Sequence, residues 1–219
     1  MRKRKIALRK PLSKEFQKGK VKGEIILFQS IGTRIFHWGF TFSLTGVLLS
    51  GLELHKPAKF LSVTYSDVFQ VHVISNWFAL GFTALRLADA FLRQDKSLIP
   101  KAHDVKLFPK LLAYYFFLRS SPPPGRKYNS GQTLMYFSWL FLFLVASLLG
   151  LASYWQGEHL IWVWRLVGGF QRLRWIKFII TIYFLATIPI HIYLTLTENL
   201  SHLQAIVTGY ERKPPPKKS

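Results

Sequence analysis

The sequence predicts an all-α integral membrane protein, a bundle of four transmembrane helices with both termini in the cytoplasm. Half of the 219 residues are hydrophobic and only 18% are charged, although the net charge is +20. Four apolar blocks are long enough to cross a bilayer, which takes roughly 20 residues of helix. Most Lys and Arg residues lie between these blocks rather than within them. Together these observations favour a membrane protein over a soluble domain.

The predicted helices cover about residues 35–52, 69–92, 133–154 and 175–196. The Trp-rich connection before the fourth helix suits a membrane interface and can form a short helix there. Three consecutive prolines at 122–124 prevent a helix just before the third span. We therefore divide the chain into a basic N-terminal arm (1–32), a four-helix domain (33–211) and a basic, Pro-rich tail (212–219).

The positions of Lys and Arg predict the orientation. Residues 1–34, 93–127 and those after Gly209 hold 23 of the 30 Lys and Arg residues, whereas the two intervening connections hold five. Because the excess lies on the cytoplasmic side, both termini are predicted to face the cytoplasm, called the inner side below. Residues 1–23 lack an apolar core, so we expect no removable signal peptide.

The composition also excludes several classes of protein. A nucleic-acid-binding protein can be equally basic, but it spreads Lys and Arg over a folded surface. The chain has no cysteine, so it cannot hold a thiolate-ligated iron–sulfur cluster or attach haem covalently. A metal site must therefore use histidine or other side chains.

Three histidines lie within the predicted spans, where ionisable side chains are costly and mark candidate functional sites. His37 and His191 lie near the inner ends of the first and fourth spans, and His72 near the outer end of the second. His37 and His191 can bind one haem iron from opposite faces, because two imidazoles give a low-spin centre that transfers single electrons. Alternatively, each only hydrogen-bonds a neighbouring helix. The other histidines fall in predicted loops or helix ends and are expected on the surface: His55, His103, His159 and His202.

A second haem would need a partner for His72 at the outer level. Position 177 lies fourteen residues before His191, roughly 21 Å and about four turns along one helix. It therefore shares the face of His191 and the depth of His72, and the residue there is Lys177. A lysine amine that has lost its proton can bind iron. Alternatively, Lys177 extends to the outer interface, and His72 is left with His55, His159, water or no haem.

Several stretches resemble the cytochrome b subunit family shared by respiratory formate dehydrogenases, membrane-bound nickel–iron hydrogenases and thiosulfate reductases. They are RIFHW (34–38), the SGL that ends the first span (50–52), His72, KYNSGQ (127–132), IHIYL (190–194) and AIVTGY (205–210). The resemblance covers about residues 30–211. KYNSGQ is its most specific element and is similar to the formate dehydrogenase gamma subunit.

This resemblance implies a bundle with two b haems in the cell's inner membrane. It implies electron transfer from catalytic and iron–sulfur partner subunits to a quinone, either menaquinone or ubiquinone. His37 and His191 would hold the inner haem iron, and His72 the outer. The family has a histidine at the position of Lys177, so the ligation of the outer haem in this chain stays open. The basic arm is expected to touch anionic lipid headgroups or a partner.

KYNSGQ predicts a quinone site at the inner end of the third span. Asn129 and Gln132 carry amide donors for the quinone carbonyls, and Gly131 lets a ring approach the backbone. The same residues suit a helix N-terminus capped by Asn129 or Ser130. Only the resemblance favours the quinone.

The sequence thus predicts a haem b-containing membrane anchor and electron-transfer subunit that is not catalytic alone. It would link a formate dehydrogenase-like or hydrogenase-like partner to the quinone pool. The alternative is a small transporter or proton-conducting subunit without haem, which would show an internal repeat or broken helices. Pro189 is the only proline well inside a predicted span, and the two halves show no convincing repeat. A purely structural anchor is a third hypothesis.

Overall fold

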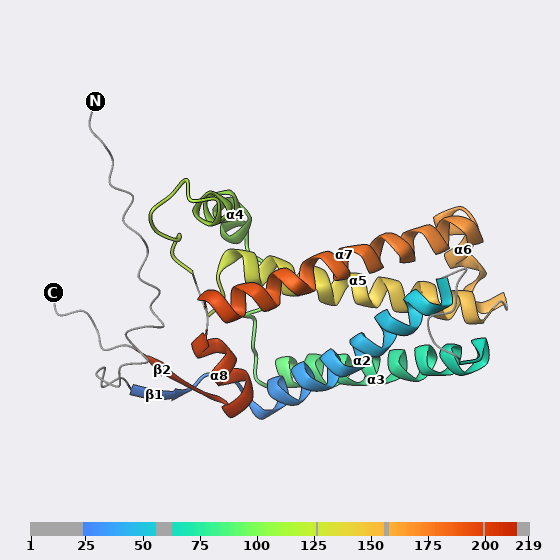
Figure 1. The fold of residues 1–219 in the computed structure, drawn as a ribbon, viewed down its shortest axis with the longest axis horizontal. Coiled ribbons are helices and arrows are strands. Elements are labelled where there is room, and N and C mark those ends of the chain that lie inside the picture. The colour runs from blue at the N-terminus through green and yellow to red at the C-terminus, as the bar shows by residue number, and fades with distance from the viewer. Residues whose placement is uncertain (1–23, 56–62, 126, 156–157, 199, 214–219) are drawn as a thin grey trace. The chain divides into compact units, whose positions relative to one another are not determined.

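Four long helices dominate the computed structural model, which describes residues 24–55, 63–125, 127–155, 158–198 and 200–213 (Figure 1). They are α2 (Ile31–His55), α3 (Tyr65–Leu92), α5 (Ser130–Tyr154) and α7 (Phe170–Glu198). Each is long and apolar enough to cross a membrane, which confirms the four predicted spans. The expectations for residues 1–23 and 214–219 lie outside the described residues.

All four helices begin earlier than the apolar windows predicted. Their first turns contain polar residues, so a window of apolar residues excludes them. Polar residues can nevertheless form helical hydrogen bonds at a membrane surface. The helix α3 begins after Thr64, whose side chain accepts a hydrogen bond from the Asp67 amide at 3.2 Å. The helix α7 continues through Pro189 without a break, so it lacks the interruption that the transporter hypothesis requires.

The chain forms two compact units. Of the described residues, those in 24–37 and 185–213 form unit 1, and those in 38–184 form unit 2. Unit 1 therefore contains the first turns of α2 and the last turns of α7, whereas unit 2 contains α3, α5 and the remainder of α2 and α7.

The helices of unit 2 pack through aromatic rings and hydroxyl groups. The Phe40 ring of α2 meets Phe143 of α5 edge-on, with ring centroids 5.0 Å apart. The Ser138 hydroxyl of α5 lies 2.5 Å from the Tyr183 hydroxyl of α7. The helices α2 and α3 lie side by side, joined by contacts to His72 (Figure 1). Unit 2 thus brings parts of all four candidate spans together.

The Trp-rich connection forms a short turn, η1 (Glu158–Leu160), and the helix α6 (Ile161–Val167), as predicted. The indole of Trp164 donates to the Ala152 carbonyl at 2.8 Å, which fastens α6 to the end of α5. Gly168 and Gly169, at φ of 83° and 106°, then reverse the chain into α7. Four buried residues form the core between these helices: Leu149, Ala152, Val163 and Leu173.

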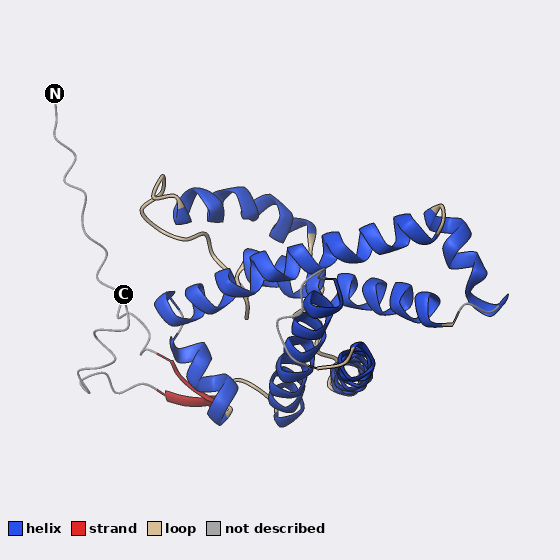
Figure 2. Cartoon of the chain, turned by 45° about the vertical axis from the view of Figure 1, so that its right-hand side comes forward, coloured by secondary structure: helices blue, strands red, loops and turns tan. Residues whose placement is uncertain are grey.

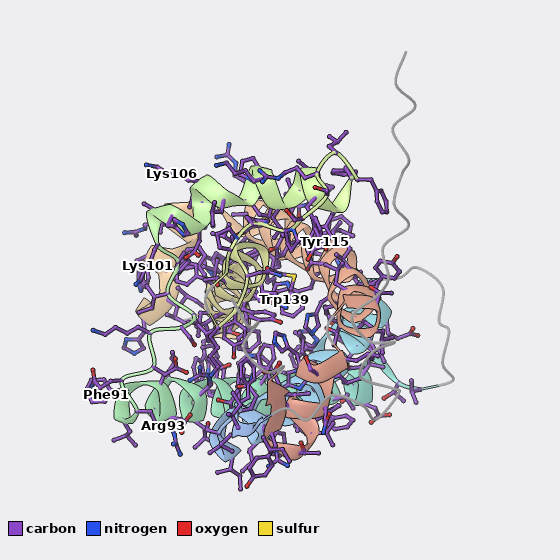
Figure 3. All side chains as sticks on the ribbon, turned by 90° about the vertical axis from the view of Figure 1, so that its left-hand side faces the viewer. Phe91, Arg93, Lys101, Lys106, Tyr115 and Trp139 are labelled. Carbon is purple, nitrogen blue, oxygen red and sulfur yellow. The ribbon has the colours of Figure 1, made fainter. Side chains whose placement is uncertain are left out.

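The helix α4 (Ala102–Tyr115) was not predicted, because its 14 residues are too short and too basic for a membrane span. It is amphipathic. Leu111 is buried beside Gly131, at the N-terminus of α5. Figure 3 shows Lys106 of α4 and Lys101, which precedes the helix, pointing outward, whereas Trp139 of α5 is half-buried. The helix therefore covers the N-terminal end of α5.

Unit 1 contains two strands that the sequence analysis missed (Figure 2). β1 (Glu24–Leu27) pairs antiparallel with β2 (Tyr210–Lys213), which follows the helix α8 (Leu200–Thr208). Gly209, at φ 93°, turns the chain from α8 into β2, and its carbonyl accepts from the Phe28 amide at 2.9 Å. Arg34 donates to the Val207 carbonyl. The RIFHW and AIVTGY stretches therefore meet in unit 1.

A cluster of charges in unit 2 fixes the connection that follows α3. The Arg86 guanidinium is only 3% exposed and donates to an Asp95 carboxylate oxygen at 3.1 Å. Burial raises the pKa of Asp95, but hydrogen bonds from Ser97 and the positive charges of Lys127 and Arg86 outweigh it, so this pKa lies below its usual value. Lys127, the first residue of KYNSGQ, thus belongs to the same charge cluster.

Gly39 of α2 tests how closely α2 and α3 must approach. A methyl group there would overlap the Phe82 ring of α3, so we expect Gly39→Ala to destabilise the fold by about 1–3 kcal/mol. Gly81→Ala is the matched control, because its methyl group meets no atom within 4 Å. Thermal unfolding in detergent, followed by circular dichroism, measures both. Equal unfolding temperatures for the two variants would contradict the close approach.

Asp95→Asn tests the buried charge cluster. Removing the partner of a buried guanidinium should destabilise the fold by about 3 kcal/mol. Because the pKa of Asp95 is lowered on folding, its stabilisation is present above the usual aspartate pKa and lost as the pH falls below it. Unfolding at several pH values should therefore show less loss of stability in acid for Asp95→Asn. Arg93→Gln, which disrupts the pair of the 55% exposed Arg93 with Asp89, should change stability little.

Candidate functional site

His37 and His191 lie together in unit 1. His37 is in the second turn of α2, and His191 is about two turns before the end of α7. Both side chains are half-buried, and the rings are close enough for their charges to interact. The structure therefore brings together the two histidines that the sequence analysis paired by depth.

This donor set suits a haem better than a bare metal ion. Among the described residues, no group of three or more His, Cys, Asp or Glu side chains could hold a metal ion. A porphyrin supplies four of the six iron ligands and leaves two positions, which imidazoles fill in many cytochromes. Two neighbouring imidazoles on apolar helices thus fit a haem.

His72 and Lys177 both lie in unit 2, near enough for the Lys177 charge to act on the imidazole. The Nδ1 atom of His72 is 3.1 Å from the Val47 carbonyl oxygen of α2. The Lys177 amine donates to the Ser153 hydroxyl of α5 at 3.0 Å. Both side chains thus have hydrogen-bond partners on a neighbouring helix of the same unit.

The histidines proposed as alternatives to Lys177 are on the surface. His55 is exposed and stacks on Phe178, with ring centroids 5.4 Å apart, and His159 is exposed on η1. His103 is exposed on α4. His202 was also expected on the surface, but it is half-buried and stacks on Phe28 at 5.0 Å. Burial lowers the pKa of His202, although the nearby Glu211 carboxylate opposes this.

KYNSGQ forms the N-terminus of α5. The Asn129 side-chain oxygen accepts from the Gln132 amide at 2.8 Å, and the Gln132 side-chain oxygen accepts from the Asn129 amide at 3.1 Å. This reciprocal capping box occupies the two side-chain oxygens. Its hydrogen bonds do not involve the side-chain NH2 groups, which are the donors that a quinone carbonyl needs.

Gly131 has a packing role that the sequence analysis did not foresee. A Cβ atom at this position would lie 2.8 Å from Leu111 of α4, so the glycine lets α4 pack against α5. Nearby, Ser130 and Thr133 are 3% and 0% exposed, and their hydroxyls have no hydrogen-bond partner in the described part of the chain. Sequence reasoning offered Ser130 only as a possible helix cap and did not single out Thr133, because a serine or threonine at a helix start most often serves as a cap.

A row of aromatic rings (Tyr128, Tyr136 and Trp139) lies beside the capping box and along α5. The rings of Tyr128 and Tyr136 meet edge-on at 5.5 Å, and Trp139 lies 6.2 Å beyond Tyr136. Tyr128 is buried, and the Lys127 amine lies 5.5 Å from its ring centroid. The amide donors of Asn129 and Gln132 are thus close in sequence to aromatic rings, the combination that binds flat, polar-edged ligands.

Two surface grooves of unit 2 lie away from these residues. One groove follows α3 and is lined by apolar side chains that include Trp77, Phe78 and Leu85. Another lies between α3 and Tyr154 of α5. Their apolar linings on membrane helices suit lipid chains rather than chemistry.

A family model described as prokaryotic cytochrome b561 matches residues 29–209. This range includes all four candidate spans, the two histidines His37 and His191, and the pair of His72 and Lys177. No curated protein matches the chain. It is a multi-pass membrane protein of the kind that transfers electrons through haem b. The chain therefore belongs to the prokaryotic cytochrome b561 family.

Proposed function

We propose that the chain is the membrane anchor and electron-transfer subunit of a quinone-linked oxidoreductase complex, with one haem b held by His37 and His191. The observation that carries this proposal is that two half-buried histidines from apolar helices, His37 of α2 and His191 of α7, lie in the same compact unit, within reach of each other's charge. When bound, haem b supplies a carrier of single electrons. The imidazoles of His37 and His191 would both bind its iron and leave no open position for oxygen, which suits electron transfer.

The primary substrate would react on a different subunit. The chain has no cysteine and so cannot ligate the iron–sulfur clusters that connect such catalytic subunits to a membrane haem. We therefore propose a partner of the formate dehydrogenase or hydrogenase type, with its own iron–sulfur subunit. The resemblance of KYNSGQ to a formate dehydrogenase gamma subunit supports the first type.

We place both termini and α4 on the cytoplasmic face of the inner membrane. The excess of Lys and Arg in residues 1–34 and 93–127 supports this orientation. The helix α4 adds to it, because Lys106 and Lys110 are exposed beside Val105, which is 57% exposed. An amphipathic helix with exposed lysines suits the anionic headgroups of a cytoplasmic leaflet.

We propose that quinone binds at the N-terminus of α5. The NH2 groups of Asn129 and Gln132 would donate to a quinone carbonyl, and the nearby row of aromatic rings would contact the quinone ring. Lys127 supports a route for protons, since it is half-buried and burial lowers its pKa despite the nearby Asp95 carboxylate. Gly131 contributes by admitting α4, which covers this end of the helix.

His37→Ala and His191→Ala test the haem ligands. Each variant should lose the haem of unit 1, because one imidazole and a methyl group cannot hold a six-coordinate iron. The ratio of haem b to polypeptide, measured by pyridine haemochrome on monodisperse protein, should fall by one. His103→Ala, which removes an exposed histidine, should leave the ratio unchanged. An unaltered ratio and Soret band in both test variants would exclude His37 and His191 as ligands.

Asn129→Ser separates quinone binding from helix capping. Serine preserves the N-cap but removes the NH2 group, so quinone-linked oxidation of the reduced haem should slow roughly tenfold, as for one lost hydrogen bond, with the haem content intact. Stopped-flow absorbance measures the rate. Thr64→Ala, which removes the cap of α3, controls for the loss of about 1 kcal/mol of capping energy. Wild-type rates for Asn129→Ser would leave Asn129 with a capping role only.

A further inference from the structure

We propose that His72 and Lys177 are the two axial ligands of a second haem b, held in unit 2 by one imidazole and one amine. This inference rests on the proposed function and adds to it the identity of an unusual ligand. It concerns Lys177 above all, because a lysine within a membrane helix needs a physical explanation.

The hydrogen bonds of His72 leave its other nitrogen available for iron. The Val47 carbonyl oxygen, 3.1 Å from Nδ1, can only accept, so Nδ1 carries the ring proton and Nε2 has the lone pair. The Ser50 hydroxyl, also 3.1 Å from Nδ1, donates its own hydrogen to the Gly46 carbonyl at 2.5 Å. It is therefore a second acceptor for the same proton. Histidines that bind metals are commonly held in this way by a carbonyl oxygen.

The backbone of α2 also makes room for this ring. A Cβ atom on Gly51 would lie 3.3 Å from the Cε1 atom of His72, which is closer than most such contacts. Gly51 and Ser50 belong to the SGL stretch at the end of the first predicted span. Together with Val47, they fix the imidazole on the side of α3 that faces α2.

Lys177 has no ionic role that explains its position. In the part of the chain that the structure describes, no carboxylate forms an ion pair with it, and the charge next to it on α7 is that of Arg174. A lysine in a span usually pairs with an anion or extends to the membrane interface. Lys177 instead remains half-buried and donates to Ser153 of α5 at 3.0 Å, near His72.

The residues fit a haem by the chemistry of their donors. An amine nitrogen, once its proton has passed to solvent, offers iron a lone pair much as an imidazole does. His72 comes from α3 and Lys177 from α7, while Ser50 of α2 and Ser153 of α5 hold them in place. The site thus has one residue from each of the four long helices. The exposed positions of His55 and His159 favour Lys177 over these histidines as the partner of His72.

The haem content and spectra of the purified full-length chain test this inference. We expect a haem b to polypeptide ratio near two and two low-spin signals in electron paramagnetic resonance, one for each ligand set. Lys177→Ala and His72→Ala should each abolish the same low-spin signal, with loss of one haem or its conversion to high spin. The signal from the His37 and His191 site should persist and reports that the variants are folded.

Two further variants distinguish an iron ligand from a structural cation. Lys177→His should retain the second haem and shift its signal to that of a bis-imidazole centre. Lys177→Arg keeps the positive charge but offers no lone pair, so it should behave like Lys177→Ala. Wild-type spectra for Lys177→Arg would overturn the inference. So would a wild-type ratio near one, which leaves the proposed function intact, whereas a ratio of zero would overturn both.

Discussion

A polar side chain within a membrane helix must find its partner on another helix, because lipid offers none. This constraint shapes unit 2 of the protein. In unit 2, His72 reaches a carbonyl of α2, Lys177 reaches a hydroxyl of α5, and Ser147 of α5 donates to the side chain of Asn76 on α3 at 3.1 Å. Apolar contacts between helices compete with equally apolar lipid, so these polar contacts contribute much of the specificity of helix arrangement.

The two proposed ligand pairs lie in different units. His72 has a carbonyl and a hydroxyl at its Nδ1 atom, and Lys177 has a hydroxyl at its amine. The His37 and His191 pair instead lies in unit 1, where β1, β2 and α8 join the start of α2 to the chain beyond α7. Because the axial ligands and their hydrogen bonds determine the reduction potential of a haem, two sites built so differently would not be equivalent.

Hydropathy alone was sufficient to predict the four spans, since each needs only about 20 apolar residues. It could not predict α4, which is amphipathic and lies at the end of α5, or the strands, which pair residues far apart in the sequence. The histidines could be singled out because their side chains are costly in lipid. Their supports could not, because a carbonyl such as that of Val47 has no sequence signature and a serine such as Ser153 has too many possible roles. For Asn129 and Gln132 the sequence suggested a cap or a quinone site, and the structure contains the cap.

The pairing of β1 with β2 also affects the order in which the protein is made. Synthesis proceeds from the N-terminus, so β1 and His37 leave the ribosome long before α8 and β2 exist. The strands can pair only after residue 210 has been translated, when the four long helices have already been made. Completion of unit 1, with the histidine pair inside it, thus comes late in biogenesis, because it must wait until both partners of the strand pair have been translated.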